Sequence, residues 1–325
     1  MPVVYDPAHR RHSPRVEILY GRPLAHPEQP ERVEAVRQAL VGTRWEGAVV
    51  SPRAYPLELA ETVHDAAYVV HLGERGVEAE SEGLDGEWFP YVFARDRSLD
   101  TGTPIQRGTM EVAWASACVA LTATDLVREG SHAAYGLCRP PGHHASRGAS
   151  GGYCYFNNAA LAAARLMARG VEQVAILDLD IHHGNGTQDI FWRDERVLYC
   201  SIHGEPEWAY PPHTGFAGET GAGAGAGTTF NQPLPQGTTW GGYRPALQRA
   251  LERIVSRSSS YLVLSQGFDT HEGDRWGGFL LHAEDYAEIG RLVRSACLPV
   301  VALLEGGYEP ANLAAGSLAL LGGLS

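Results

Sequence analysis

The pattern of hydrophobic and polar residues changes near Ala133. From there onward, short apolar runs alternate with longer segments in which apolar residues recur at helical spacing. This alternation is typical of a parallel sheet whose two faces are covered by helices. Buried strands are predicted at Ala133–Cys138, Val174–Asp180, Val197–His203, Tyr261–Asp269 and Pro299–Glu305.

Helices are predicted between these strands and in the first third of the chain. Their ranges are Pro30–Leu40, Thr109–Val127, Phe156–Ala168, Trp240–Ser256 and Ala283–Ala296. The repeated order of strand, loop and helix favours one doubly wound α/β unit, and no segment rich in Pro, Gly or Ser marks a domain boundary. We therefore expect a single domain over residues 1–325.

Two segments follow neither pattern. Glu78–Thr103 is rich in acidic and aromatic residues and is longer than a routine connection. It is either a solvated acidic loop with a few packed aromatics or a segment that faces substrate or a second subunit. Gly221–Gly227 alternates glycine with alanine, and we expect a mobile loop there rather than a strand.

Composition narrows the class of protein. The net charge is −12 and no run of basic residues occurs, so nothing supports a nucleic-acid-binding surface. The 5 cysteines are odd in number and widely spread, which fits reduced thiols better than disulfides or a paired-cysteine metal site. No basic segment leads into an apolar one at the N-terminus, and we expect no apolar run to reach membrane-spanning length. We expect a cytoplasmic protein with no membrane segment.

Acids and imidazoles concentrate directly after the predicted strand Val174–Asp180, in the segment Asp178–Gly186. Open α/β sheets bind their ligands at the carboxyl ends of strands. Because alternate residues of an extended chain project to the same side, Asp178, Asp180 and His182 can share a direction. Each residue alone could cap a turn or be hydrogen-bonded within the structure, but burying the whole cluster without a metal would be costly.

Three further predicted strand ends carry reactive side chains. They are the segments Arg139–His144, with sequence RPPGHH, Gln266–Asp269, with sequence QGFD, and Glu305–Tyr308, with sequence EGGY. Carboxylates, imidazoles and a phenol would then meet at one edge of the sheet, as a site built on a parallel sheet requires. The alternative for Tyr308 is an ordinary packed tyrosine.

The order of these motifs, Pro-Gly-His-His, Asp-x-Asp-x-His-His-Gly-Asn-Gly, Gly-Phe-Asp and Glu-Gly-Gly-Tyr, resembles that of the histone deacetylase superfamily. Within it, the chain is most similar to the bacterial acetylpolyamine amidohydrolases. The resemblance implies the arginase/deacetylase fold, a single α/β domain with a mainly parallel sheet of about eight strands flanked by helices. It also implies that Asp180, His182 and Asp269 bind zinc. This ligand set leaves positions open for water and a carbonyl oxygen, which suits catalytic Zn²⁺, although Fe²⁺ could use it as well.

The resemblance further implies hydrolysis of an amide by a metal-activated water. His144 would act as the general base and then as the acid toward the leaving amine, while Asp178 would hold and bias His143. Tyr308 would donate its hydroxyl to the oxyanion, and the two glycines before it are expected to let its loop swing in.

Asn185 stands where the histone-directed members usually have aspartate. Without a carboxylate partner the imidazolium is less favoured, so we predict that His144 titrates lower than a carboxylate-paired histidine. The resemblance also implies a narrow substrate tunnel lined by Gly152, Tyr153 and Tyr210, although both tyrosines could instead be core aromatics. It implies structural K⁺ near the zinc site, bound through Asp178, Asp180, His182 and Ser201.

The expected substrate is a small acylated amine, either a polyamine or a lysine-like amine. The alternative is a protein acyl-lysine deacetylase of the class II type. The acidic stretch Glu78–Glu87 could steer a cationic substrate toward the site. The family suggests a homo-oligomer, with a dimer favoured, although Glu78–Thr103 is shorter than the dimer-forming insertion of the best-known polyamine enzymes.

Two other functions compete with this one. A dinuclear ureohydrolase would need more carboxylates than the segments Gly184–Asn185 and Asp269–His271 provide, and His271 is expected at the rim of the site. A non-catalytic binding module would be expected to lack a ligand, a histidine or the tyrosine, and all are present.

Overall fold

Eight parallel strands form one sheet in the computed structural model, which describes residues 1–19 and 21–325. The order across the sheet is β10-β9-β8-β11-β12-β7-β1-β4, and the chain folds as a single α/β domain. The strands are β1 (Val3–Val4), β4 (Val49–Val50), β7 (Ala133–Gly136), β8 (Val174–Asp178), β9 (Val197–Gly204), β10 (Thr229–Leu234), β11 (Tyr261–Gln266) and β12 (Val300–Leu304). The predicted eight-stranded parallel architecture is confirmed.

The five strands predicted from apolar runs are all present, each within three residues of its predicted ends. The sequence pattern missed β1, β4 and β10. Two of these are only two residues long, too short to show any periodicity. The third, β10, lies at one edge of the sheet and contains Pro233, which a central strand would not tolerate.

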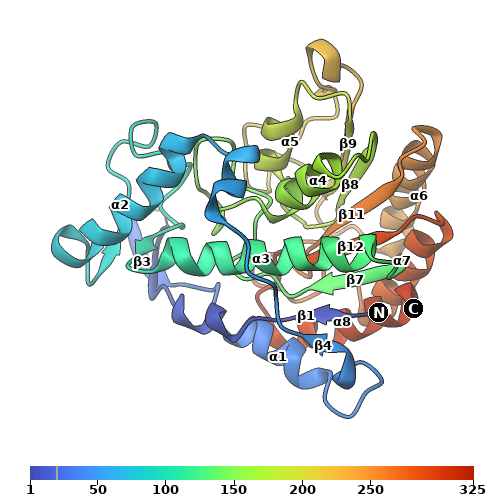
Figure 1. The fold of residues 1–325 in the computed structure, drawn as a ribbon, viewed down its shortest axis with the longest axis horizontal. Coiled ribbons are helices and arrows are strands. Elements are labelled where there is room, and N and C mark those ends of the chain that lie inside the picture. Colours follow the sequence, from blue (N-terminus) through green and yellow to red (C-terminus); the bar gives the residue numbers. More distant parts are fainter. Residues whose placement is uncertain (20) are drawn as a thin grey trace.

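Helices cover both faces of the sheet (Figure 1). Alternate residues of β8 enter two different cores, with Ala175 and Leu177 in one and Val174 and Ile176 in the other. The first core includes residues of α1 (Glu31–Ala39), α6 (Trp240–Ser256), α7 (Ala283–Ser295) and α8 (Pro310–Leu324). The second includes residues of α2 (Ala66–Glu82), α3 (Thr109–Arg128), α4 (Asn158–Ala168) and α5 (Asn185–Phe191).

Helix α3 is long and apolar enough to cross a membrane by length and composition, with a mean hydropathy of 1.3 over 18 residues. The expectation that no apolar run reaches this length is therefore wrong. The same window is 67% buried within the protein, against α4 and β7. Its apolar character is that of a core helix.

The segment Glu78–Thr103 starts as the last turn of α2 and continues through the short strand β5 (Glu87–Trp88). This strand pairs with β6 (Ile105–Gln106), and a second antiparallel pair is formed by β2 (Val16–Leu19) and β3 (Arg22–Ala25). Glu87 is fully buried and accepts the backbone N–H of Arg15, so this acid is not part of a solvated loop. The segment Gly221–Gly227 forms a loop that contains one turn of 3₁₀ helix.

Candidate active site

Four neighbouring strands, β8, β11, β12 and β7, end at the same edge of the sheet, and each is followed by one of the four motifs. The strands are parallel, so their carboxyl ends lie side by side. The order along the chain differs from the order in space, because the last strand, β12, lies between β11 and β7. This arrangement brings segments as distant as Gly142 and Tyr308 to one site.

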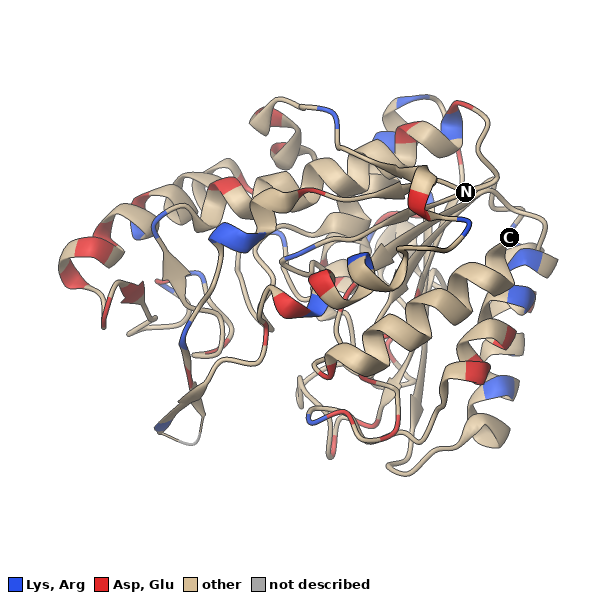
Figure 2. Cartoon of the chain, turned by 90° about the horizontal axis from the view of Figure 1, so that it is seen from below, with Lys and Arg blue, Asp and Glu red and all other residues tan. Residues whose placement is uncertain are grey.

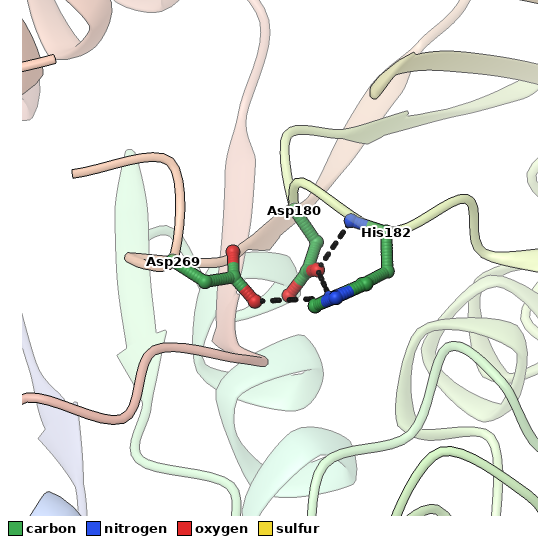
Figure 3. A group of neighbouring side chains, drawn as sticks. All are labelled: Asp180, His182 and Asp269. Atoms are coloured by element: carbon green, nitrogen blue, oxygen red, sulfur yellow. Dashed lines mark hydrogen bonds and ion pairs between the residues drawn. The ribbon is translucent and has the colours of Figure 1, made fainter. Parts of the chain in front are cut away.

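Asp180, His182 and Asp269 lie together, with one ligand atom from each within 4.8 Å of the others (Figure 3). His182 Nδ1 is 3.1 Å from Asp180 Oδ1 and 3.2 Å from Asp269 Oδ2. Backbone N–H groups fix both carboxylates: Asp269 Oδ1 accepts from Ile181, and Asp180 Oδ2 accepts from Gly306. Among the described residues, this is the one group of three or more potential metal ligands.

The chemistry of this group fits a bound cation. Both carboxylates are fully buried, and apart from the 3.2 Å ion pair with His182 Nδ1, Asp269 Oδ2 has no hydrogen-bond donor within the described part of the chain. Burial, followed by the negative charge of Asp180, raises the pKa of Asp269 to about 7. Two buried carboxylates facing one space are costly unless a positive charge lies between them. One imidazole and two carboxylates are ligands that zinc binds.

His143 lies beside Asp178 at the carboxyl end of β8. Its Nδ1 is 3.1 Å from Asp178 Oδ2, and its Nε2 is 3.8 Å from Asp180 Oδ1. Burial opposes protonation of the ring, but the charges of Asp178 and Asp180 prevail and raise the pKa of His143 to about 10. The hydroxyl of Tyr199 also donates to Asp178 Oδ2, at 3.1 Å, which fixes the carboxylate.

His144 has the opposite electrostatic environment. Its Nδ1 lies 2.7 Å from Asn185 Oδ1, and its ring centroid is 4.0 Å from that of His143. Burial, followed by the positive charges of His143 and His182, lowers the pKa of His144 well below its ordinary value. The hydrogen bond to Asn185 itself raises this pKa, so the comparison with a carboxylate-paired histidine stays a prediction. If the amide oxygen of Asn185 accepts, Nδ1 carries the proton and Nε2 has the free lone pair.

Glu305, the first residue of the EGGY motif, fixes the turn that carries both histidines. Its Oε2 accepts the backbone N–H groups of Gly142, at 2.7 Å, and His143, at 3.2 Å. Its Oε1 accepts from the hydroxyl of Ser265, at 3.1 Å. The carboxyl is fully buried, and burial raises its pKa to about 7.

The loop that leads to Tyr308 is closely packed in this structure, and the movement expected from its glycines stays a prediction. All residues of Glu305–Tyr308 are buried. A Cβ atom on Gly306 would lie 2.1 Å from Asp269 Oδ2 and 2.5 Å from Asp180 Oδ2. Gly307 has a φ of +111°, which favours glycine. The two glycines therefore permit a close approach of the backbone to the metal ligands.

A pocket opens onto these groups, with a volume of about 160 Å³. His144, His182 and Tyr308 lie at its base, and the predicted Gly152, Tyr153 and Tyr210 are among its walls. The two tyrosines thus border a cavity rather than a closed core. The ring centroids of Tyr153 and Tyr308 are 5.7 Å apart, and those of His144 and Tyr210 are 5.0 Å apart.

Two carboxylates in this pocket, Glu17 and Asp100, were not predicted as site residues from the sequence. Glu17 Oε2 accepts from the hydroxyl of Tyr153 at 2.8 Å, whereas Glu17 Oε1 is buried and has no partner in the described residues. Asp100 Oδ2 accepts from Gly152 N and from the Tyr210 hydroxyl, both at 2.7 Å. None of the acids of Glu78–Glu87 lines the pocket, so the predicted steering stretch is not the acidic part of this site.

Two other predicted residues have clear positions. Ser201 lies directly opposite Asp178 in the β8–β9 pairing, and its hydroxyl is 2.7 Å from His203 Nδ1. Its role in K⁺ binding stays a prediction. His271 does not line the pocket; it stacks on Tyr286 with ring centroids 6.1 Å apart.

Comparisons with known proteins agree with this geometry. The histone deacetylase domain matches residues 26–324. The chain is 39% identical to acetylpolyamine amidohydrolase 1 of Pseudomonas aeruginosa over 323 residues, covering 94% of this chain and 93% of that protein. It is also 39% identical to the acetylpolyamine amidohydrolase of Mycoplana ramosa, with 95% of each chain covered.

Solved structures show the same likeness. The crystal structure of an acetylpolyamine aminohydrolase from Burkholderia pseudomallei superposes with a TM-score of 0.95 at 35% identity, over 99% of this chain and 98% of that one. The HD domain of HDA15 superposes with a TM-score of 0.85 at 28% identity, over 99% and 90%. The chain therefore belongs to the histone deacetylase family, and it is a deacetylase similar to bacterial acetylpolyamine amidohydrolases.

Proposed function

We propose that the protein is a zinc-dependent amidohydrolase that removes acetyl or similar acyl groups from acylated polyamines. The observation that carries the proposal is that one pocket is lined by His182 of the Asp180, His182 and Asp269 group, by His144 of the histidine pair and by Tyr308. The likeness to acetylpolyamine amidohydrolases supports the same reaction.

Asp180, His182 and Asp269 would hold the ion. Zn²⁺ bound there supplies a Lewis acid for the amide carbonyl and lowers the pKa of a coordinated water. Fe²⁺ could take the same ligands. We also propose K⁺ as a structural ion near Asp178, Asp180, His182 and Ser201.

His144 is the residue that we assign to proton transfer. Its lowered pKa keeps the ring neutral, and its hydrogen bond to Asn185 leaves Nε2 free to accept a proton from the attacking water. The same nitrogen then donates that proton to the departing amine. His143 remains protonated beside Asp178, because the pKa of its ring is raised.

Tyr308 is the residue that we assign to the oxyanion. Burial raises the pKa of its hydroxyl well above the ordinary value, so the group stays protonated and can donate a hydrogen bond. A positioned donor of this kind stabilises the tetrahedral intermediate more than the planar amide.

The preference for polyamines rests on Glu17, whose Oε1 is buried and has no partner in the described residues. A buried carboxylate oxygen without a donor is costly, and a second ammonium or amine group of the substrate would satisfy it. The walls formed by Tyr153 and Tyr210 suit the methylene chain between the amines.

A substrate panel on zinc-loaded enzyme tests the proposal, with acetylputrescine, acetylspermidine and acetyl-lysine peptides assayed with and without a hydroxamate chelator. We expect turnover of the acetylated polyamines that the hydroxamate abolishes. Robust activity on peptides with none on polyamines would favour the class II acyl-lysine alternative. Urea release from guanidino substrates would favour a ureohydrolase instead.

We also propose a homodimer that forms through the α2 arm, which we define as Ala66–Phe93. Six of its large hydrophobic residues are exposed, four of them by more than half: Val70 by 58%, Val77 by 68%, Leu84 by 56% and Tyr91 by 93%. Val70 and Val77 lie seven residues apart, on one side of the helix. Exposed apolar surface of this kind marks interaction sites.

We also propose a cytoplasmic location, since all five cysteines are free thiols.

A further inference from the structure

Asp274 lies outside the four motifs, but its carboxylate holds the backbone of Tyr308. Asp274 Oδ2 accepts the N–H of Tyr308 at 2.6 Å and the N–H of Glu309 at 3.2 Å. Its Oδ1 accepts the N–H of Trp276, a residue of the pocket wall, at 3.0 Å. The side chain is buried, with 9% of its surface exposed.

The position of the Asp274 carboxylate is favoured by the start of helix α8. Helix α8 begins at Pro310, directly after the two N–H groups that Asp274 accepts. Backbone N–H groups at the start of a helix have no partner within the helix, and the helix dipole favours a negative charge there. The interaction therefore fixes the peptide from which the Tyr308 side chain reaches the pocket.

Other groups hold the same loop. Arg32 donates to the carbonyl oxygens of Gly307 and Glu305, and its guanidinium lies 4.9 Å from the centroid of the Tyr308 ring. The N–H of Gly306 donates to the ligand carboxylate Asp180 at 2.8 Å. The backbone is thus anchored at consecutive residues, and Asp274 supplies the anchor at Tyr308 itself.

Asp274 also belongs to the loop that starts at Asp269. The N–H of Gly277 donates to the Asp274 carbonyl at 3.1 Å, and the N–H of Asp274 donates to the His271 carbonyl at 3.2 Å, so the loop is internally braced. One short braced segment therefore carries both a metal-ligand carboxylate and the anchor of the catalytic phenol. Its geometry sets how far the phenol lies from the ligand group.

We propose that Asp274 is a positioning residue, which fixes the backbone of Tyr308 so that its hydroxyl meets the oxyanion. The inference rests on the role of Tyr308 given under the proposed function. Misplacement of a catalytic group by about 1 Å can cost a large part of its contribution to the rate. Loss of the Asp274 anchor should therefore lower kcat and leave substrate binding largely intact.

A double-mutant cycle tests this inference, using Asp274→Ala, Tyr308→Phe and the double variant, all loaded with zinc. We expect Asp274→Ala to lower kcat about tenfold or more, with a much smaller change in KM. In the Tyr308→Phe background the same change should cost little further activity, because the group that Asp274 positions is already lost. Asp274→Asn keeps a carbonyl acceptor and should fall between the wild type and Asp274→Ala.

Asp285 provides a matched control. It is also 9% exposed, and it accepts the backbone N–H of His282 at the start of α7, away from the pocket. Asp285→Asn should lower thermal stability as much as Asp274→Asn does, and leave kcat unchanged. If Asp274→Ala does not fold, Asp274→Asn replaces it in the double-mutant cycle, and the kcat of that variant tests the inference.

Unchanged kcat in a folded, zinc-loaded Asp274 variant would overturn the inference. It would also be overturned if the fold-losses in kcat of Asp274→Ala and Tyr308→Phe multiplied in the double variant, because the two residues would then act independently. Those outcomes leave the proposed function standing if Tyr308→Phe alone is inactive. Full activity of Tyr308→Phe would instead remove the oxyanion role itself, and the inference with it.

Discussion

At the scale of single residues, Asn185 makes the clearest electrostatic prediction. A neutral His144 is the active form of the base, so kcat/KM should fall as the pH falls through the pKa of His144. In Asn185→Asp, a negative charge beside His144 Nδ1 stabilises the imidazolium and raises that pKa. We expect the acid limb of the pH–rate profile to move to higher pH by about one unit. An unmoved acid limb would contradict the assignment of His144 as the base.

Glu17 makes a prediction about the substrate. In Glu17→Gln, the amide can still accept from the Tyr153 hydroxyl, but the negative charge in the pocket is lost. We expect KM for acetylspermidine to rise about tenfold, which corresponds to one charge-assisted hydrogen bond. The matched comparison is an N-alkylacetamide with no distal amine, whose KM should not change. Equal effects on both substrates would show that Glu17 serves the pocket structure and not the distal cation.

The residues that sequence alone could identify are those that belong to a motif. Asp180, His182 and Asp269 follow strand ends, where residue type and local spacing already indicate a metal site. Glu17 and Asp100 reach the pocket only through tertiary folding, one from a short antiparallel strand and the other from an irregular segment. No local pattern distinguishes such acids from surface carboxylates.

At the scale of elements, the loop after β12 is shaped by close packing. Gly306→Ala would place a methyl group against both ligand carboxylates, at 2.1 Å and 2.5 Å. We expect bound zinc and activity to be lost, while the free energy of unfolding of the metal-free protein falls by about 1–3 kcal/mol. Metal analysis and urea unfolding measure the two effects. Gly322→Ala, in α8, meets no atom within 4 Å and should retain both zinc and activity.

The core strands were predictable because apolar runs mark segments that are buried on both faces. Four of the five were predicted one to three residues too long at the carboxyl end, since the first residues of each following loop are also buried, whereas β9 extends one residue beyond its predicted end. The close packing of the Tyr308 loop could not be predicted for a related reason. A pair of glycines in sequence indicates either mobility or close contact, and only the neighbours in space, here Asp180 and Asp269, distinguish the two.

At the scale of the whole molecule, the α2 arm projects from the body of the protein (Figure 1), and acidic residues gather at its outer end (Figure 2). If the arm forms the dimer interface, a charge at its exposed apolar face should separate the subunits. We expect light scattering to give a dimer for the wild type and a monomer for Val77→Glu. Val255→Glu, at a residue of α6 that is 55% exposed, should stay dimeric. A wild-type monomer would contradict the proposed assembly.

The order of strands in the sheet could not be predicted from the sequence pattern alone. Apolar runs give the order along the chain, whereas the site depends on β12 lying between β11 and β7. This position of β12 places the Glu305–Tyr308 segment between the ligand Asp269 and the turn that carries His143 and His144. The family resemblance supplied this information, because the same four motifs in the same order imply the same sheet.

The central claim is that Asp180, His182 and Asp269 hold one catalytic zinc ion, and the zinc content of the purified protein tests it most directly. Both the wild type and Asp180→Ala are exposed equally to zinc, and the excess is removed before elemental analysis. We expect about one zinc ion per chain in the wild type and almost none in Asp180→Ala. Two ions per chain in the wild type, or a full ion retained by Asp180→Ala, would contradict the account.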